Sequence, residues 1–513
     1  MTLVLAMSMI QRLLPSIESV KVEQVTLESS FLDYVSGVFD VPGTVALISG
    51  NSVDNDPNDS ARYHIVGMYP WLIIHSKNKI TSITIKDEIA GDKTFKFNES
   101  SFCVLKEILS NFNYANSVVK VADSVDLNLK DLLNTLPFIF GFMGYLSYDL
   151  NQHLDSIPKT CVDDLLLPDL YMCAPSVVCI HDTLNNNSFI STVSLSNSKM
   201  RTDAELLVRK FLDKSCFYKV ADNCLFNSGC LLSEPVSNMG RSRFVKAVHT
   251  ARSYIAKGDV FQINLSHRFK SNILSHPFDI FRYWYEQNPA PFFAYVNASP
   301  LLDLTPHNII STSPERFLCR FKDVLETKPI KGTRPRGETL YSDRELKDIL
   351  HNSKKDDAEL TMIVDLVRND LAKVCLPGTI NVSSHKMIES YKNVHHLVST
   401  VRGLLEPTND SVDAIKALFP GGSITGCPKL RAMELIDELE MHQRHVYTGS
   451  IGYISFHETF DLSIAIRTGI CVGNTMYFSV GSGIVFDSDP EQEYQETLDK
   501  AHAVYSLSKI VNK

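Results

Sequence analysis

The sequence lacks most of the features that mark membrane, secreted or nucleic-acid-binding proteins. No apolar run reaches the roughly 20 residues that span a bilayer, and no basic residues precede the apolar stretch Met1–Ile10, unlike in a signal peptide. The 11 cysteines are odd in number and none forms a Cys-x-x-Cys pair, which favours reduced thiols over disulfides or a zinc site. The formal net charge of -9 argues against a broad nucleic-acid-binding face. We therefore expect a globular, cytoplasmic protein with neither a membrane nor a nucleic acid as partner.

The chain is long enough for two large domains. A length of 513 residues exceeds that of one ordinary domain. The polar stretch Ala221–Asn238 is the best boundary, so we predict an N-terminal region over 1–235 and a second region over 236–513. The first region reads mainly as strands, with a loop over 51–59. In the second, a helix is predicted over 243–257 and a strand over 260–266.

A lysine in a turn is the first candidate for chemistry. Lys331 lies between Pro329 and Gly332 after an apolar strand, so its amine can be aimed with little freedom left to lose. A neutral lysine amine can attack carbon, although a lysine in a turn is more commonly a solvated surface group. Glu315 falls between two expected strands, where it can serve as a general acid or base or simply occupy a surface turn.

Two predicted helices carry acids that suit a metal ion. Glu359 lies near the start of a helix predicted over 356–370, and Glu493, Glu496 and Lys500 fall on one face of a C-terminal helix. Carboxylate oxygens with room for water suit Mg²⁺. Acids also stabilise a helix N-terminus or coat a solvated face, so the local pattern leaves both interpretations open.

A glycine-rich segment, Phe419–Lys429, precedes a helix predicted over 430–439. Its glycines and Pro428 expose backbone N–H groups that can hold an anion. The segment lacks the Gly-Lys-Ser/Thr ending of a P-loop. A bound carboxylate and a purely structural loop both fit this pattern.

In this order and spacing, these segments resemble the chorismate-utilising enzymes, the family of the anthranilate, aminodeoxychorismate, isochorismate and salicylate synthases. The resemblance is strong over Met239–Lys500 and extends weakly to Gly141–Leu150 and Leu167–Asp169. It implies an α+β fold in which two packed, mostly antiparallel β-sheets are flanked by outer helices. It also implies an active site in the cleft between the N- and C-terminal parts.

Two positions sort the members of this family by reaction. Members that activate water carry a lysine where Gln262 stands, whereas ammonia users carry glutamine; an amine can deprotonate water and an amide cannot. Within Pro329–Thr333, anthranilate synthases carry a small residue at the middle position, and Lys331 is similar to the aminodeoxychorismate synthases. The resemblance thus implies conversion of chorismate and ammonia to 4-amino-4-deoxychorismate, on the route to p-aminobenzoate and folate.

The resemblance also implies catalytic roles. Lys331 would attack ring carbon 2 as the 4-hydroxyl leaves, and ammonia would then attack carbon 4 and release the lysine. Glu315 would move protons near the leaving hydroxyl. His396 matches a histidine near that group, and a structural role for it is equally open.

The remaining site residues are implied by the same resemblance. Mg²⁺ would bind the ring carboxylate, held by Glu359, Glu493 and Glu496. Substrate-binding positions are matched by Gln262, Thr333, Thr425, Tyr447, Arg467, Gly481, Ser482, Gly483 and Lys500.

The family resemblance further implies a partner and a second ligand. The chain has no recognisable glutaminase, so we expect a separate glutamine amidotransferase subunit to supply ammonia, or free ammonia at high pH. Some relatives bind tryptophan, and the matching positions are Ser49, Arg62, Phe261, Asn264, Pro291 and Phe292. The Leu-Leu-Glu-Ser motif of anthranilate synthases reads Ala46–Ser49 here, without the glutamate, which speaks against feedback control and leaves a structural tryptophan open.

Two alternatives remain. One is anthranilate synthase component I, which Lys331 disfavours. The other is a non-catalytic chorismate-binding protein, which the retained glutamates and catalytic groups disfavour.

Overall fold

The structure is a computed structural model that describes residues 3–50, 61–86, 91–112, 117–196, 204–217, 230–298 and 304–509. The predicted loop over 51–59 lies outside these residues, as does half of the predicted boundary Ala221–Asn238. The division into regions 1–235 and 236–513 therefore stays a prediction.

Two long strands, β3 (Tyr63–Lys77) and β8 (Leu170–Asp182), pair along their length and connect two β-sheets. Their ladder is interrupted after Pro70, which lies opposite Pro175. Proline has no N–H to donate to the ladder, and Tyr69 beside it adopts a φ of 55°. On one side of this interruption β3 pairs with β2 (Val45–Ile48), and on the other with β4 (Ile80–Ile85). Each long strand thus takes part in both sheets.

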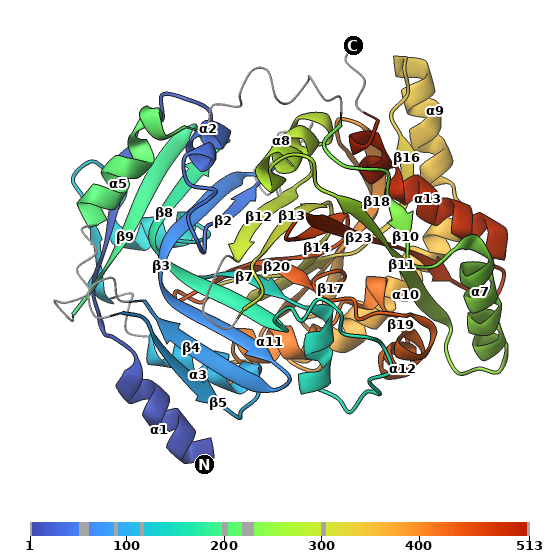
Figure 1. Ribbon diagram of the computed structural model, residues 1–513, viewed down its shortest axis with the longest axis horizontal. Coiled ribbons are helices and arrows are strands. Elements are labelled where there is room, and N and C mark those ends of the chain that lie inside the picture. Colours follow the sequence, from blue (N-terminus) through green and yellow to red (C-terminus); the bar gives the residue numbers. More distant parts are fainter. Residues whose placement is uncertain are drawn as a thin grey trace.

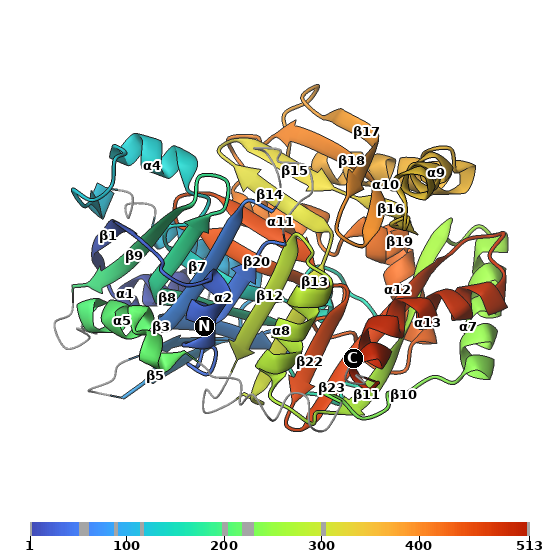
Figure 2. The same ribbon diagram turned by 90° about the horizontal axis from the view of Figure 1, so that it is seen from above.

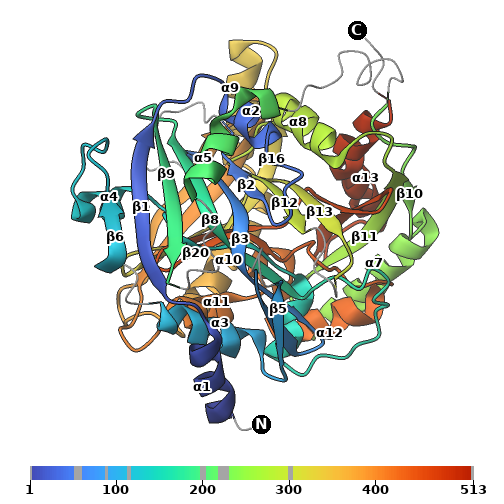
Figure 3. The same cartoon turned by 60° about the vertical axis from the view of Figure 1, so that its left-hand side comes forward.

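The first sheet continues from these strands toward both sides, and Figure 3 shows β1, β9, β8 and β3 side by side. In order of hydrogen-bonded neighbours it contains β6 (Val119–Val121), β1 (Ile17–Val25), β9 (Asn187–Leu195), β8, β3, β2, β12 (Phe292–Ala298), β13 (His307–Ser313), β22 (Thr468–Val472), β23 (Thr475–Ile484) and β11 (Gln262–Asn272), with β10 (Val236–Ser237) and β19 (Gly426–Cys427) on the far side of β11.

The second sheet contains β5 (Lys93–Phe97), β4, β3, β8, β7 (Gly141–Leu146), β20 (Ser450–Ser455), β21 (Phe460–Ile464), β14 (Arg316–Phe321), β15 (Val324–Lys328) and β18 (Val394–Leu404), and β18 also pairs with β16 (Ile330–Pro335) and β17 (Asn381–Ser390). Every pairing among the described strands is antiparallel except that of β1 with β6. The predicted α+β fold of mostly antiparallel sheets is therefore confirmed.

Helices lie on the outside of the sheets. Figure 2 shows α7, α12 and α13 beside β11, and α8 against β12 and β13. None of the helices within the described ranges is both long and apolar enough to cross a membrane. The helices are α1 (Leu3–Leu13), α2 (Phe31–Ser36), α3 (Ser101–Asn111), α4 (Leu129–Thr135), α5 (Ala204–Leu212), α7 (Arg241–Ala256), α8 (Pro277–Gln287), α9 (Leu340–His351), α10 (Lys354–Leu371), α11 (Ser411–Leu418), α12 (Lys429–Leu439) and α13 (Pro490–Leu507).

Two of these helices position acidic side chains, and local sequence explains both. The Ser353 side chain accepts from the Asp356 backbone at the start of α10, and the apolar stripe of this helix is buried. Asp489 caps α13 in the same way, and Pro490 occupies its first turn. Helices predicted over 243–257 and 430–439 are confirmed as α7 and α12, whereas the strand predicted over 260–266 extends to Asn272 because its second half pairs with β23.

Candidate active site

The site lies where the far edges of the two sheets approach each other. Strand β16 of the second sheet carries Lys331, and strands β11 and β23 of the first sheet lie opposite it (Figure 1). All the groups that meet here come from residues 262–500. The sheet edges that carry these groups both belong to the C-terminal half, and the expected cleft between the N- and C-terminal parts stays a prediction.

An irregularity in β16 aims Lys331 toward the first sheet. The β16–β18 register shifts between Ile330 and Thr333, and Gly332 has a φ of 79°. A Cβ on Gly332 would lie 2.9 Å from Asp356 Cγ, so both conformation and space favour glycine. The Lys331 side chain is only 14% exposed, and its Nζ lies 3.7 Å from the position that a Cβ on Gly483 would take. The amine thus points between the sheets rather than into bulk solvent.

Two glycines on β23 form the floor opposite Lys331. A Cβ on Gly483 would lie 2.5 Å from Gln262 Nε2, and a Cβ on Gly481 would lie 2.6 Å from Asn264 Oδ1 and 3.0 Å from the Tyr447 hydroxyl. The side chains of Gln262 and Asn264 therefore pack directly against the backbone of Gly483 and Gly481, and a larger residue at either position of β23 would displace them. Among the described residues, neither Gln262 Oε1 nor Asn264 Oδ1 has a hydrogen-bond partner, so the floor presents two buried acceptors.

The three predicted metal-binding glutamates lie around this floor. Glu359 on α10 is 4.0 Å from Lys331 Nζ, and Ser482 Oγ donates to Glu493 on α13. Glu496 pairs with Lys500 at 2.7 Å, and Lys500 Nζ donates to the Gly481 carbonyl at 2.9 Å.

Burial and neighbouring charges shift the pKa of two of these acids in opposite directions. Burial raises the pKa of Glu359 against the effect of Lys331, and the nearby Glu496 adds to the rise. Burial alone would also raise the pKa of Glu496, but the Lys500 ammonium and other partners outweigh it and lower that pKa.

The glutamates do not form a ready-made metal centre. Within the described ranges, no three acidic, histidine or cysteine groups lie close enough together to hold an ion, because Lys331, Ser482 and Lys500 engage the glutamates one by one. The donor chemistry nevertheless fits Mg²⁺, which prefers oxygen ligands. Repulsion between the carboxylates of Glu359 and Glu496 is also what a divalent cation relieves. Magnesium therefore stays a prediction.

Glu315 lies close to β16, near both Ile330 and Lys331. Its side chain is 4% exposed, accepts from the Ser423 hydroxyl, and lies 3.5 Å from the Ile330 backbone nitrogen. Burial raises the pKa of Glu315 to about 7, although Lys331 acts in the opposite direction. A carboxyl group with this pKa can both give and take a proton near neutral pH.

The glycine-rich segment forms a wall of the site. Gly421, Gly422 and Ser423 surround a small cavity of about 20 Å³ together with Glu315. The Thr425 carbonyl accepts from the Asn264 backbone at 2.8 Å, and Thr425 Oγ1 donates to the Gly421 carbonyl at 2.8 Å. These contacts give the segment a structural function beside Glu315, and its role in anion binding stays a prediction.

Arg467 and His396 complete the set. Burial lowers the pKa of Arg467, and within the described part of the chain no carboxylate pairs with its guanidinium. A half-buried arginine without an acidic partner favours an anionic ligand. Burial lowers the pKa of His396 to about 3, so it is neutral, and its Nδ1 lies 2.9 Å from Thr333 Oγ1. His396 and Thr333 thereby fix β16 two residues after Lys331.

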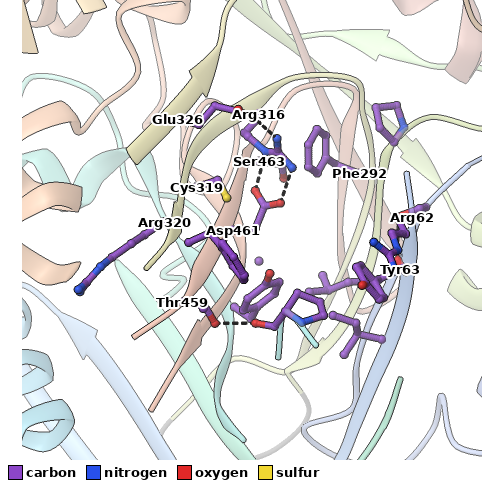
Figure 4. Close-up of a pocket in the computed structure, with 18 of the residues that line it drawn as sticks. Arg62, Tyr63, Phe292, Arg316, Cys319, Arg320, Glu326, Thr459, Asp461 and Ser463 are labelled. Carbon is purple, nitrogen blue, oxygen red and sulfur yellow. Dashed lines mark hydrogen bonds and ion pairs between the residues drawn. The ribbon is translucent and has the colours of Figure 1, made fainter. Parts of the chain in front are cut away.

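A cavity of about 870 Å³, part of whose lining is drawn in Figure 4, does not include Lys331 among its lining residues. Arg316, the first residue of β14, lines this cavity, whereas Glu315, which directly precedes the strand, lines the small cavity beside the glycine-rich segment. Four of the six residues predicted to bind tryptophan also line the larger cavity, namely Ser49, Arg62, Pro291 and Phe292.

The other two residues of that prediction lie elsewhere. Phe261 is 70% exposed at the start of β11, and Asn264 lies over Gly481 in the active site. Strands β12, β13, β22 and β23 separate β11 from β2, so the expectation of one six-residue pocket is wrong. The signal that places Asn264 correctly is its spacing of two residues from Gln262, which puts both on one face of a strand.

Comparison with known proteins fits this site. Residues 81–506 match the family described as chorismate binding enzyme. The chain belongs to the chorismate-binding enzyme family. Its sequence is 34% identical to aminodeoxychorismate synthase component 1 of Bacillus subtilis (strain 168) over 448 residues, which cover 86% of this chain and 88% of the relative. It is also 35% identical to anthranilate synthase component 1 of Aquifex aeolicus (strain VF5) over 378 residues, which cover 73% and 75%.

A solved structure of a related enzyme is also similar to this chorismate-binding enzyme. The crystal structure of anthranilate synthase component I from Streptococcus pneumoniae TIGR4 is 28% identical, with a TM-score of 0.71, and the match covers 89% of this chain and 94% of that chain. Relatives of both names are thus similar to nearly the same degree, so overall identity does not separate the two reactions.

Proposed function

We propose that this chorismate-binding enzyme is the large subunit of an aminodeoxychorismate synthase, which converts chorismate and ammonia to 4-amino-4-deoxychorismate. The observation that carries the proposal is the placement of Lys331. Its mostly buried amine faces the glycine floor, 4.0 Å from Glu359 and close enough to Glu315 to affect its pKa. An alanine at this point could not act as a nucleophile.

The proposed chemistry has two steps. In the first, the neutral Lys331 nitrogen bonds to ring carbon 2, the two conjugated double bonds C1=C2 and C5=C6 shift to C1=C6 and C4=C5, and the bond from carbon 4 to oxygen breaks. Glu315 donates the proton with which the hydroxyl leaves as water. In the second, ammonia bonds to carbon 4, the two double bonds shift back to C1=C2 and C5=C6, and the lysine nitrogen leaves with the electron pair of its bond to carbon 2. The Glu315 carboxylate takes the proton that the new amine releases, which restores its acid form.

Cationic and N–H groups bind the substrate in this proposal. Chorismate carries two carboxylates, and Arg467 is a half-buried cation without a described carboxylate partner. Lys500 and the backbone of Gly481 and Gly483 lie on the opposite side of the ring position. Tyr447, Thr425 and Thr333 border the same space, and Gln262 provides an amide where a water-activating base would otherwise stand.

Glu359, Glu493 and Glu496 would hold Mg²⁺ on the side of Lys500 and Ser482. When bound there, the ion would draw electron density from the ring through the substrate carboxylate. The protein groups retain their own tasks: Glu359 faces the Lys331 amine, and Ser482 and Lys500 orient the two acids of α13.

We further propose a cytoplasmic complex with a glutamine amidotransferase as ammonia donor, which the relatives' designation as component 1 supports. Tryptophan is the ligand we expect in the cavity of Ser49, Arg62, Pro291 and Phe292, in a structural role.

The second candidate is anthranilate synthase, which the similar identity to the Aquifex relative favours. One experiment separates the two: purified protein is incubated with chorismate, Mg²⁺ and ammonium salt, and products are separated before and after addition of aminodeoxychorismate lyase. We expect p-aminobenzoate only after the lyase. Direct formation of fluorescent anthranilate would reject the proposal, and chorismate binding without turnover would identify a non-catalytic protein.

A further inference from the structure

A buried arginine outside the predicted set, Arg444, connects the segments that build the substrate site. Its side chain is 2% exposed, and all five of its N–H groups donate hydrogen bonds. The acceptors are Glu440 Oε2 at 3.0 Å, Glu440 Oε1 at 2.6 Å, the Asn264 carbonyl at 2.7 Å, the Ile424 carbonyl at 3.1 Å and Thr448 Oγ1 at 3.3 Å.

Three of these acceptors, on Asn264, Ile424 and Thr448, belong to different walls of the site. Asn264 lies on β11 and covers Gly481 with its side chain. Ile424 belongs to the glycine-rich segment beside Glu315, and its neighbour Thr425 accepts from the Asn264 backbone. Thr448 follows Tyr447, whose hydroxyl also borders Gly481. A single side chain therefore fixes the spacing between three segments that are far apart in the sequence.

Glu440 extends the same connection. Besides its pair with Arg444, its Oε1 accepts from both the backbone nitrogen and the hydroxyl of Ser266, each at 2.8 Å. Ser266 lies directly opposite Gly481 in the β11–β23 register. The guanidinium also lies over the ring of Tyr148, 4.7 Å from its centroid, so an N-terminal segment packs on the pair.

We propose that Arg444, held by Glu440, is a positioning residue that sets the geometry of the substrate-binding floor and of Tyr447. This inference rests on the proposed function only in taking chorismate as the ligand of that floor. Arg444 reaches the site through Asn264, Ile424 and Thr448, so its loss should weaken substrate binding more than it slows the chemical steps at Lys331 and Glu315.

A lysine cannot replace this arginine. Its ammonium has three donors and no planar fork, so it cannot hold the Glu440 carboxylate bidentately and reach the Asn264, Ile424 and Thr448 acceptors as well. Arg444→Lys keeps the charge and most of the volume while it releases part of the connection. The variant therefore tests geometry rather than charge.

Arg268→Lys is the matched control. Arg268 lies on the site strand β11 and is only 8% exposed. Its guanidinium pairs bidentately with Asp164 at 3.1 and 2.5 Å and lies over the Tyr477 ring. Its side chain has no contact with the floor among the described contacts. We expect Arg268→Lys to lower the melting temperature with an unchanged KM for chorismate.

The test is steady-state kinetics with chorismate at saturating ammonia and Mg²⁺, together with calorimetric titration of chorismate. We expect Arg444→Lys to raise both KM and Kd by about tenfold, with kcat within about threefold of wild type. Glu440→Gln, which keeps shape but weakens the pair, should raise KM in the same direction. An unchanged KM in either soluble variant, or an equal rise in Arg268→Lys, would overturn the proposal.

The outcome does not depend on which product forms. If the wild type makes anthranilate, the proposed function fails while the effect of Arg444→Lys on chorismate KM and Kd still decides this inference. Should Arg444→Lys not fold, Glu440→Gln alone decides it by the same criterion.

Discussion

The amine of Lys331 lies 4.0 Å from the carboxylate of Glu359, one on strand β16 and the other on helix α10. This pairing couples the proposed nucleophile to a proposed metal ligand. A cation that draws Glu359 toward itself would release the lysine amine from its counter-ion. The two predicted functions, covalent attack and magnesium binding, are therefore linked through one ion pair.

Replacement of the nucleophile should stop the reaction and leave the fold. We expect Lys331→Ala to slow formation of 4-amino-4-deoxychorismate on the order of a thousandfold or more, with a melting temperature close to that of the wild type. Lys328→Ala is the control, since this neighbouring lysine pairs with Glu389 outside the site at 3.4 Å. Equal rates for Lys331→Ala and Lys328→Ala would rule out a nucleophilic role for Lys331.

Glu315 should set the alkaline limb of the pH profile. Because its pKa is raised to about 7, its acid form is lost as pH rises through that value. We expect kcat at a constant concentration of free ammonia to fall above about pH 7, and Glu315→Gln to be slower and to lack this limb. A limb that persists in Glu315→Gln would assign it to another group.

The same pKa gives a stability prediction. A carboxyl whose pKa is raised from 4.5 to about 7 by burial stabilises the folded state fully only below the unfolded value, and this contribution is lost as pH rises through 7. The melting temperature of Glu315→Gln minus that of the wild type should therefore be higher at pH 8 than at pH 5. Thermal denaturation of both proteins at the two pH values measures this difference, and an equal difference at pH 5 and pH 8 would contradict the prediction.

Magnesium should bind where the acids of α10 and α13 face each other. We expect Glu359→Gln and Glu496→Gln each to raise the Mg²⁺ concentration needed for half-maximal activity and to reduce the increase in melting temperature that Mg²⁺ causes. Glu389→Gln, remote from this point, should resemble the wild type. Superimposable titrations for all four proteins would show that the ion binds elsewhere.

The glycine floor should not tolerate a methyl group. A Cβ on Gly483 would displace Gln262 Nε2, which lies only 2.5 Å from that position, and would approach Lys331 Nζ. Since the displaced atom is the end of a flexible side chain, we expect Gly483→Ala to fold normally and lose most activity. Gly240→Ala, which meets nothing within 4 Å, is the control; equal activity of the two would show that the floor does not contact the substrate.

Sequence patterns predict the individual residues of this site better than they predict where in the fold these residues come together. Local rules sufficed for α7 and α10, because capping and an apolar stripe are properties of a short segment. The resemblance predicts Lys331, Glu315 and Gln262 in one site, and in the structure Lys331 lies near both Gln262 and Glu315.

The sequence does not predict which distant strands and segments lie next to each other. The resemblance assigns Asn264 to the tryptophan pocket and Gln262, two residues away, to the active site; the pairing of β11 with β23 shows that both side chains lie over the glycines of β23. The sequence does not predict the role of Arg444, because its bonds to the Ile424 and Asn264 carbonyls join residues that lie far apart in the chain. The position of the site between two sheet edges likewise follows from strand order, which local periodicity does not contain.

The sharing of β3 and β8 by both sheets bears on how the chain can be divided. Strand β12 pairs with β2, and β20 pairs with β7, so each half of the polypeptide completes ladders begun by the other. Fragments severed near residue 235 would each expose bare strand edges of the kind that promote aggregation. Such fragments should be recoverable only when produced together, as a complementing pair rather than as two autonomous modules.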